Sequence, residues 1–123
     1  MKRFLILLCL LSLLLSGCSL RNRGVSLSPA CRVSAMEVLS VTDQYLDNKL
    51  SAVLAAGRIN DLCLSLSITP PEPGASNQLV VSACDTINHT IMLIVEGYQI
   101  DHTELLTARN SLAYLLGQKT RNK

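Results

Sequence analysis

Cysteine is the residue type in this chain best suited to covalent chemistry, and its five copies fall into two groups. Cys9 and Cys18 lie within or directly after an apolar N-terminal run, whereas Cys31, Cys63 and Cys84 are spread through the rest of the sequence. A thiol can be alkylated, can pair as a disulfide or can bind a metal, and its surroundings decide which of these occurs. Two small residues, Ser16 and Gly17, stand directly before Cys18.

The residues upstream of Cys18 have the organisation of a secretory signal. Lys2 and Arg3 form a positively charged n-region, and residues 4–15 form an apolar h-region of signal-peptide length. Together with Leu15-Ser16-Gly17-Cys18 they resemble the signal peptide and lipobox of bacterial lipoproteins. The resemblance implies that residues 1–17 are removed and that Cys18 becomes the lipidated N-terminus. By the same resemblance, an Asp after the lipidated cysteine would imply retention in the inner membrane. Residue 19 is Ser, which implies that the lipid anchor lies in the periplasmic leaflet of the outer membrane.

A transmembrane anchor is the main alternative for the N-terminal run, and a buried core helix is the other. Spanning a bilayer takes roughly 20 apolar residues, and this run is interrupted at Ser16-Gly17 after about a dozen. The flanking basic residues and the Gly-Cys ending also fit processing better than either alternative. The sequence therefore predicts a protein that is held at the membrane by the lipid on Cys18.

Composition limits what the remaining chain can form. It has enough residues for one domain with a modest core. Trp is absent, and the aromatic residues are one Phe and three Tyr, so the core must consist of Leu, Ile, Val, Ala and Met. That composition suits helix packing better than a β-sandwich. The shortage of aromatic stacking platforms also argues against a surface that binds sugars or single-stranded nucleic acid.

Charge divides the chain into an acidic body and two basic ends. Residues 33–118 hold three basic and nine acidic residues, a formal charge of −6, whereas both flanking segments are basic. An acidic body is a poor partner for nucleic acid. The basic ends are explained by an ordinary solvated surface, and the alternative is that Arg21 and Arg23, next to the predicted lipid, contact anionic headgroups.

Helix signals divide residues 29–117 into three or four segments. Ser28-Pro29 predicts a helix start, and apolar steps of three and four residues continue to about Ala56, with Gly57 placed to end the helix. Residues 58–68 fit either a strand or a short helix, and we favour the helix because a lone strand has no partner for its backbone groups.

The second half of the chain gives clearer boundaries. The Pro-rich stretch 69–74 interrupts either element, and the apolar pattern of residues 77–97 predicts a second long helix that begins at Ser76 or Asn77 and ends near Gly97. Asp101 and Glu104 form a capping box that starts a last helix, which runs to Gly117. We therefore predict an all-α fold: a three- or four-helix up-and-down bundle (29–117) on a flexible lipidated tether (18–28), with a disordered tail (118–123).

Cys31, Cys63 and Cys84 would lie in an oxidising compartment, where one disulfide and one remaining thiol is the simplest outcome. In a hairpin of two helices around the Pro-rich turn, Cys63 and Cys84 come to similar heights. A first helix that continued to Ala56 would place Cys31 too far from Cys63 for a bridge. The predicted disulfide is therefore Cys63–Cys84, although a strand over 58–68 would change this geometry.

Groups suited to catalysis are few. Asp85 and His89 are four residues apart and predict a surface ion pair on a helix. A nucleophilic Cys84–His89 site would need an oxyanion hole and an orienting group that the sequence does not show. Cys84, His89 and His102 lack the compact spacing of a metal site, and capping explains Asp101, His102 and Glu104. The sequence thus predicts a protein that is not an enzyme and needs no cofactor or metal.

The predicted architecture is similar to that of the secretin pilotins of type II and type III secretion systems. These proteins combine a lipobox, a tether and a small helical body that bears a disulfide. That resemblance implies a protein-binding or assembly accessory factor, with a partner peptide held in a groove between helices. One alternative is an accessory lipoprotein of conjugation or phage systems, which acts in exclusion of a second conjugating cell or in lysis. Another is a small periplasmic inhibitor or enzyme.

Overall fold

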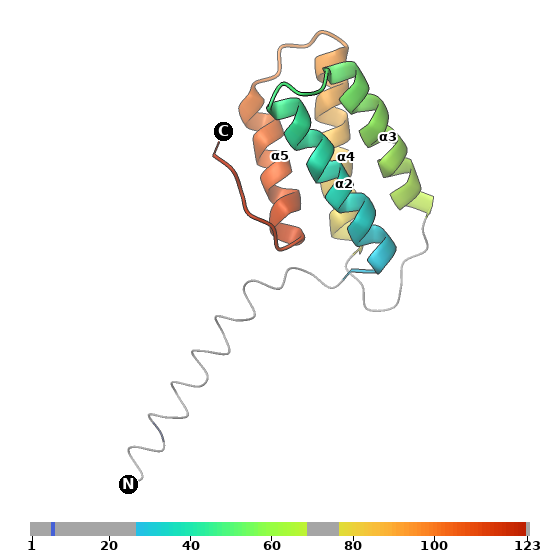
Figure 1. Ribbon diagram of the computed structural model, residues 1–123, viewed down its shortest axis with the longest axis vertical. Coiled ribbons are helices and arrows are strands. Elements are labelled where there is room, and N and C mark those ends of the chain that lie inside the picture. The colour runs from blue at the N-terminus through green and yellow to red at the C-terminus, as the bar shows by residue number, and fades with distance from the viewer. Residues whose placement is uncertain (1–5, 7–26, 69–76, 123) are drawn as a thin grey trace.

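The computed structural model describes residues 6, 27–68 and 77–122 of the chain, and these form four α-helices without a strand. The helices are α2 (Pro29–Leu46), α3 (Ala52–Ile68), α4 (Asn77–Val95) and α5 (His102–Leu115). Consecutive helices run in opposite directions (Figure 1), so the prediction of an all-α up-and-down bundle is confirmed. The predicted signal peptide apart from Ile6, and the predicted tether up to residue 26, lie outside the described residues.

The four helices enclose a rhombic cross-section. Each helix packs against its neighbours in sequence, and α2 also contacts α4 and α5, whereas α3 and α5 do not touch within the described part of the chain. The α2–α4 pair therefore forms the short diagonal of the bundle, and α3 lies on the side away from α5 (Figure 1).

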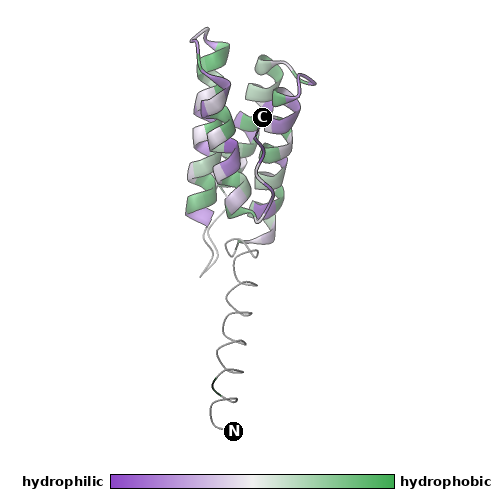
Figure 2. Ribbon diagram, turned by 90° about the vertical axis from the view of Figure 1, so that its left-hand side faces the viewer, coloured by the Kyte–Doolittle hydropathy of each residue, from purple (hydrophilic) through white to green (hydrophobic). Residues whose placement is uncertain are grey.

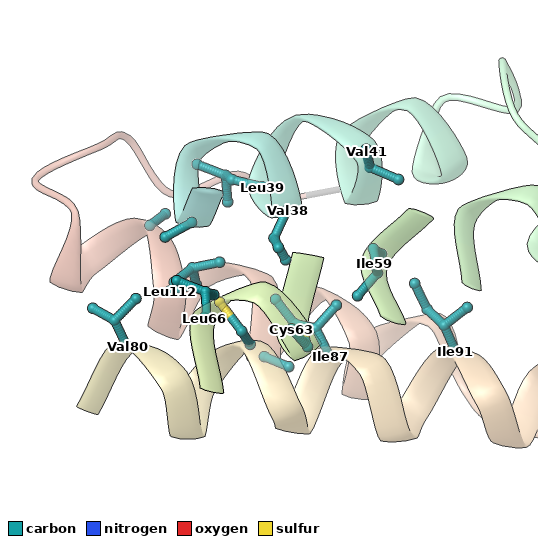
Figure 3. Close-up of a cluster of buried hydrophobic side chains, with 14 of the residues drawn as sticks. Val38, Leu39, Val41, Ile59, Cys63, Leu66, Val80, Ile87, Ile91 and Leu112 are labelled. Carbon is teal, nitrogen blue, oxygen red and sulfur yellow. The ribbon is translucent and has the colours of Figure 1, made fainter. Parts of the chain in front are cut away.

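The core is aliphatic, as the composition predicts. Figure 3 shows Val38 from α2, Ile59 from α3, Ile87 from α4 and Leu112 from α5 pointing into the space between the helices, and all four are fully buried. Hydrophobic and hydrophilic residues alternate along each helix (Figure 2), which gives every helix one face for this core. The buried apolar residues of all four helices form a single cluster.

The predicted helix from Pro29 to Ala56 is wrong, because the chain turns back after Leu46. Asn48 has a φ of 59°, and the amides of Asn48 and Lys49 donate to the carbonyls of Tyr45 and Gln44. These two hydrogen bonds are the Schellman motif that normally uses glycine in the left-handed position. Ser51 then accepts the amide hydrogen of Leu54 at 3.3 Å, at the start of α3.

Gly57, which we expected to end the first helix, lies inside α3. The ambiguous residues 58–68 are helical and continue α3 to Ile68, so the preference for a helix is confirmed. The predicted glycine endings of the other two helices are also confirmed. Gly97 and Gly117 have φ of 94° and 69°, and each forms a Schellman motif after α4 or α5.

The predicted N-terminal cap of α2 is present and binds the first residue of α4. Ser28 Oγ accepts the amide hydrogen of Cys31 at 3.4 Å, and the Asn77 side chain donates to Ser28 Oγ at 3.2 Å. The amide of Ser28 donates in turn to Asn77 Oδ1 at 3.4 Å. The first turns of α2 and α4 are thereby tied together at one end of the bundle.

Among the described helices, α4 alone is long and apolar enough in composition to cross a membrane. In the bundle its most apolar face lies in the core, where Val80, Cys84, Ile87 and Ile91 are fully buried. A core helix of a small bundle has the same length and composition, so α4 carries no argument for a membrane span.

Candidate functional site

The most elaborate group of polar contacts lies between α2, α5 and the C-terminal tail. Asp43, on α2, accepts hydrogen bonds from Arg109 Nε at 2.8 Å and from Arg109 Nη2 at 2.9 Å. Arg121 Nη1 donates to the same carboxylate at 3.1 Å. Arg109 is only 7% exposed, so its charge depends on this two-pronged carboxylate contact for compensation.

The tail is held against α5 by further hydrogen bonds, so the predicted disorder of residues 118–123 is wrong for 118–122. Arg109 Nη1 donates to the carbonyl of Lys119 at 2.7 Å. Asn110 exchanges two hydrogen bonds with the backbone of Arg121, at 2.8 and 2.9 Å. Figure 1 shows the tail running back along α5 after Gly117. A tail of polar residues can be ordered when buried or half-buried side chains bond its backbone.

Arg121 extends the network to the end of α2. Its Nη2 donates to Asp47 Oδ1 at 2.8 Å, and this hydrogen bond lowers the pKa of Asp47 below its usual value, with a smaller contribution from the charge of Lys49. The same hydrogen bond raises the pKa of Arg121. Both groups therefore stay charged through the neutral range, and the tail remains paired with α2.

An open groove of about 670 Å³ lies beside this network. Its apolar residues are Met36 and Leu39, both on α2. Lys49 and Lys119 also line it, from the α2–α3 turn and from the tail, and neither ammonium group forms a salt bridge within the described residues. The other lining residues are Ser40, Asp43, Gln44, Asp47, Arg109, Gly117 and Gln118.

This groove combines cationic and apolar side chains. Asp43 and Asp47 are already compensated by Arg109 and Arg121, which leaves the two lysine ammonium groups as the available charges. The sequence predicts a groove between helices, but it does not indicate which residues line the groove. Two residues could have indicated its position. Asp43 interrupts the apolar pattern of the first helix, and Arg109 lies within the apolar stripe of the last helix.

Asp85 and His89 do not form the predicted ion pair. Both are exposed on α4, and no salt bridge joins them in the part of the chain that the structure describes. Cys84 is fully buried while His89 is exposed, so the structure does not bring a nucleophile and a base together here. Residues 27–68 and 77–122 also contain no group of three His, Cys, Asp or Glu side chains that could hold a metal ion.

The predicted disulfide is not formed in the structure, which carries Cys31, Cys63 and Cys84 as buried thiols. Burial raises the pKa of Cys63 to about 11, with a smaller contribution from the charge of Asp85. The pKa of Cys84 is raised further, first by burial and then by Cys63 and Cys31. Burial also raises the pKa of Cys31. All three groups are therefore protonated at neutral pH and are poor nucleophiles.

The predicted large distance between Cys31 and Cys63 is also wrong. It depended on one helix continuing to Ala56, whereas α3 runs back along α2 and returns Cys63 to the end of the bundle where α2 begins. Both other cysteines contribute to the raised pKa of Cys84, so Cys84 lies near two thiols and not one.

The capping explanation is confirmed for Asp101, which is the N-terminal cap of α5. Asp101 Oδ1 accepts the amide hydrogen of Thr103 at 3.2 Å and the hydroxyl hydrogen of Thr103 at 3.2 Å. The ring of His102 lies against that of Tyr45, with centroids 6.1 Å apart. These contacts tie the start of α5 to the end of α2 and account for Asp101 and His102 as structural residues.

A second exposed feature, which sequence reasoning missed, is the outer face of α3. Leu64 is 55% exposed, Val53 66% and Ile68 79%, and Gly57 lies on the same face with no atom within 4 Å of the position its Cβ would occupy. A glycine inside a helix costs about 1 kcal/mol relative to alanine. No contact within the described chain accounts for that cost.

The predicted lipidation residue, Cys18, lies outside the described residues. Comparison of the chain with protein-family models, with curated proteins and with solved structures found no match.

Proposed function

We propose that this protein is a lipid-anchored periplasmic accessory factor whose helical body binds a segment of another protein. The observation that carries the proposal is the order of Lys2-Arg3, the apolar run and Leu15-Ser16-Gly17-Cys18. This order has the features of a lipoprotein signal. A diacylglycerol and a further acyl chain on Cys18, at about 0.8 kcal/mol per buried CH₂, would anchor the chain stably. Ser19 supports the outer membrane as the location.

The groove between α2 and the tail supports the binding part of the proposal. The half-buried Met36 offers an apolar side chain, with the buried Leu39 beneath it. Lys49 and Lys119 offer two ammonium groups without a salt bridge in the described structure. A suitable partner segment carries one or two aliphatic side chains next to a carboxylate. Such a segment would bury apolar area against α2 and place its charge between the two lysines.

The anchor is tested by intact-mass measurement of the protein extracted from membranes of a Gram-negative host. We expect loss of residues 1–17 and a mass increase from acyl groups. The Cys18→Ala variant should remain unprocessed or appear in the soluble fraction. Recovery of Cys18→Ala as the same processed, membrane-bound species would refute lipidation at this residue.

The groove is tested by a photo-crosslinking amino acid in place of Gln44, with a second variant at Ser82 as control. Gln44 lines the groove, whereas Ser82 is exposed on α4 and does not line it. We expect a specific crosslinked protein from position 44 only. Lys49→Glu combined with Lys119→Glu should lower the crosslink yield at least tenfold, since two attractive charges become repulsive. Equal yields from both positions would refute the groove as the binding site.

Two other function classes stay open to direct test. A conjugation or phage operon beside the gene would favour the accessory lipoproteins of those systems, while a secretin gene would favour the pilotin-like alternative. An inhibitor or enzyme is favoured if His89→Ala and Cys84→Ala each abolish activity without loss of folding or partner binding. The disulfide between Cys63 and Cys84 stays a prediction that depends on the oxidising compartment.

A further inference from the structure

The outer face of α3 has one side-chain hydrogen bond to another described helix, since Asn60 Oδ1 accepts from Asn88 Nδ2 of α4 at 3.3 Å. Its apolar residues are not covered by any other described part of the chain. Within the bundle α3 contacts α2 and α4 but not α5, and its far side carries an apolar stripe with two polar residues at its centre. We call this set the α3 stripe. Its members, all exposed, are Val53, Gly57, Asn60, Asp61, Leu64 and Ile68. Leu54, 58% exposed, lies beside them on the flank of Arg58.

The α3 stripe is symmetric about a point between Asn60 and Asp61. Val53 and Ile68 are equally far from that point in sequence, and so are Gly57 and Leu64. When two copies of α3 pack antiparallel around a two-fold axis at this point, each residue faces its counterpart on the second copy. Val53 then faces Ile68 of the second copy, and Leu64 faces Gly57 of the second copy.

The sizes of the facing residues are complementary. Gly57 has open space around its Cβ position, which leaves a hollow on the helix surface between the neighbouring side chains. The Leu64 side chain of the second copy can enter that hollow in the manner of a knob in a hole. This packing also gives a reason for a glycine in the middle of a helix, which no intramolecular contact explains.

The charges at the centre and along one edge are complementary as well. At the axis the Asn60 amide of one copy can donate to the Asp61 carboxylate of the other. Arg58 is exposed on the same flank of α3 as Asp61, and the two-fold axis keeps the flanks together. Arg58 of one copy therefore comes within about 3 Å in height of Asp61 of the other, so opposite charges meet on both sides of the axis.

We propose that the α3 stripe is an interface with a second copy of this chain, packed antiparallel about a two-fold axis between Asn60 and Asp61. It shares no residue with the groove beside α2, so a copy in a dimer can still bind its partner there. One helix pair is smaller than a standard interface of about 1,200 to 2,000 Å². The association is therefore weak in solution and becomes strong when the copies are concentrated on one membrane.

The predicted tether is long enough for such a pair. An antiparallel arrangement places the two α2 starts at opposite ends of α3, which is about 26 Å long for its 17 residues. Leu27 and Ser28 already pack on the bundle, and the nine residues 18–26 can extend to about 30 Å. Both lipids can then enter the same membrane.

The test is disulfide crosslinking of the full chain in host membranes, with brief copper-phenanthroline oxidation. Asn60→Cys places two thiols beside the axis, and we expect a covalent dimer as the main species. Val53→Cys alone should stay monomeric, because its two copies lie about 22 Å apart in height. Val53→Cys and Ile68→Cys produced together should give the mixed dimer. Tyr114→Cys, on the exposed side of α5, and the unchanged chain are the monomeric controls.

A second variant separates loss of the interface from loss of folding. Gly57→Leu fills the hollow on α3 where the monomer leaves open space, so the helical circular-dichroism spectrum should be unchanged. The crosslinked fraction of Asn60→Cys should fall at least fivefold in the Gly57→Leu background. Monomeric Asn60→Cys would overturn the proposal, and so would Val53→Cys dimers as abundant as the mixed ones. Crosslinking of Asn60→Cys to a different protein would assign the α3 stripe to that protein instead.

Discussion

The side of the bundle formed by α2, α5 and the tail differs from the outer side of α3 in how its exposed groups are satisfied. On the first side, Asp43, Arg109 and Arg121 form a connected network, and the chain's own C-terminus lies over the joint between the two helices. On the α3 side, apolar residues are exposed and no described segment covers them. The chain therefore stabilises one side by itself and leaves the other available for association.

The largest effect is expected from Asp43→Ala. Removal of this carboxylate leaves the guanidinium of Arg109, whose side chain is 8% exposed, without its charged partner. Breaking one side of a buried ion pair costs about 3 to 5 kcal/mol, and we expect about 4 kcal/mol less unfolding free energy. Urea denaturation of the full chain measures it. A loss below about 1 kcal/mol would show that the network contributes little to stability.

Two substitutions within α3 compare its inner and outer faces. Ile59 is fully buried in the core and Leu64 is 55% exposed. Ile59→Ala should lower the unfolding free energy by about 3 to 4 kcal/mol through lost burial and a cavity. Leu64→Ala should stay within about 0.5 kcal/mol of the unchanged chain. Both are measured at submicromolar concentration, below the range of weak association. A large loss for Leu64→Ala in the monomer would mean that another segment covers the α3 stripe.

Alkaline pH tests the buried thiols. The thiol of Cys63 ionises near 9.0 in the unfolded chain and only near 11 in the folded protein, since burial disfavours the thiolate. The stabilising contribution of this group is complete below pH 9 and is lost as the pH rises from 9 to 11. Two pKa units at 1.36 kcal/mol each give a loss of up to about 3 kcal/mol.

The measurement is the urea midpoint at a series of pH values under reducing conditions. Cys63→Ala should show a smaller alkaline loss than the unchanged chain, while Lys and Tyr titrations are common to both. Equal slopes would indicate that Cys63 is exposed or already paired. Peptide mapping without reductant then decides whether a Cys63–Cys84 disulfide has formed.

The smallest effect is expected from Asp47→Ala, which is the matched control for Asp43→Ala. Asp47 also pairs with an arginine, but its side chain is 43% exposed, against 29% for Asp43. Exposed ion pairs contribute little because water and salt screen them, so the loss of unfolding free energy should be much smaller than for Asp43→Ala. A loss equal to that of Asp43→Ala would show that both acidic residues act as one unit with Arg121.

Local signals in the sequence determined most of the helix boundaries. Ser28 and Asp101 start helices, and Gly97 and Gly117 end them, because a cap is made by hydrogen bonds among residues within one turn. The aliphatic composition was likewise enough to predict a helical bundle. The residues before Cys18 that resemble a lipobox are another local signal, and the location we propose from them requires no knowledge of the fold.

Other features were decided by contacts between distant parts of the chain. The apolar pattern continues through Leu46, Leu50 and Leu54, so periodicity alone extends the first helix across the turn where Asn48 takes the left-handed conformation. Asp43 and Arg109 are 66 positions apart. Each is a charged residue within the apolar pattern of its helix, and only the packing of α2 against α5 shows that the two form an ion pair. The order of the tail follows from that pairing, and the position of Cys31 near Cys84 follows from the turn. Caps are short-range interactions that a sequence displays directly, whereas the burial of a charge or the exposure of the α3 stripe depends on which helices pack together.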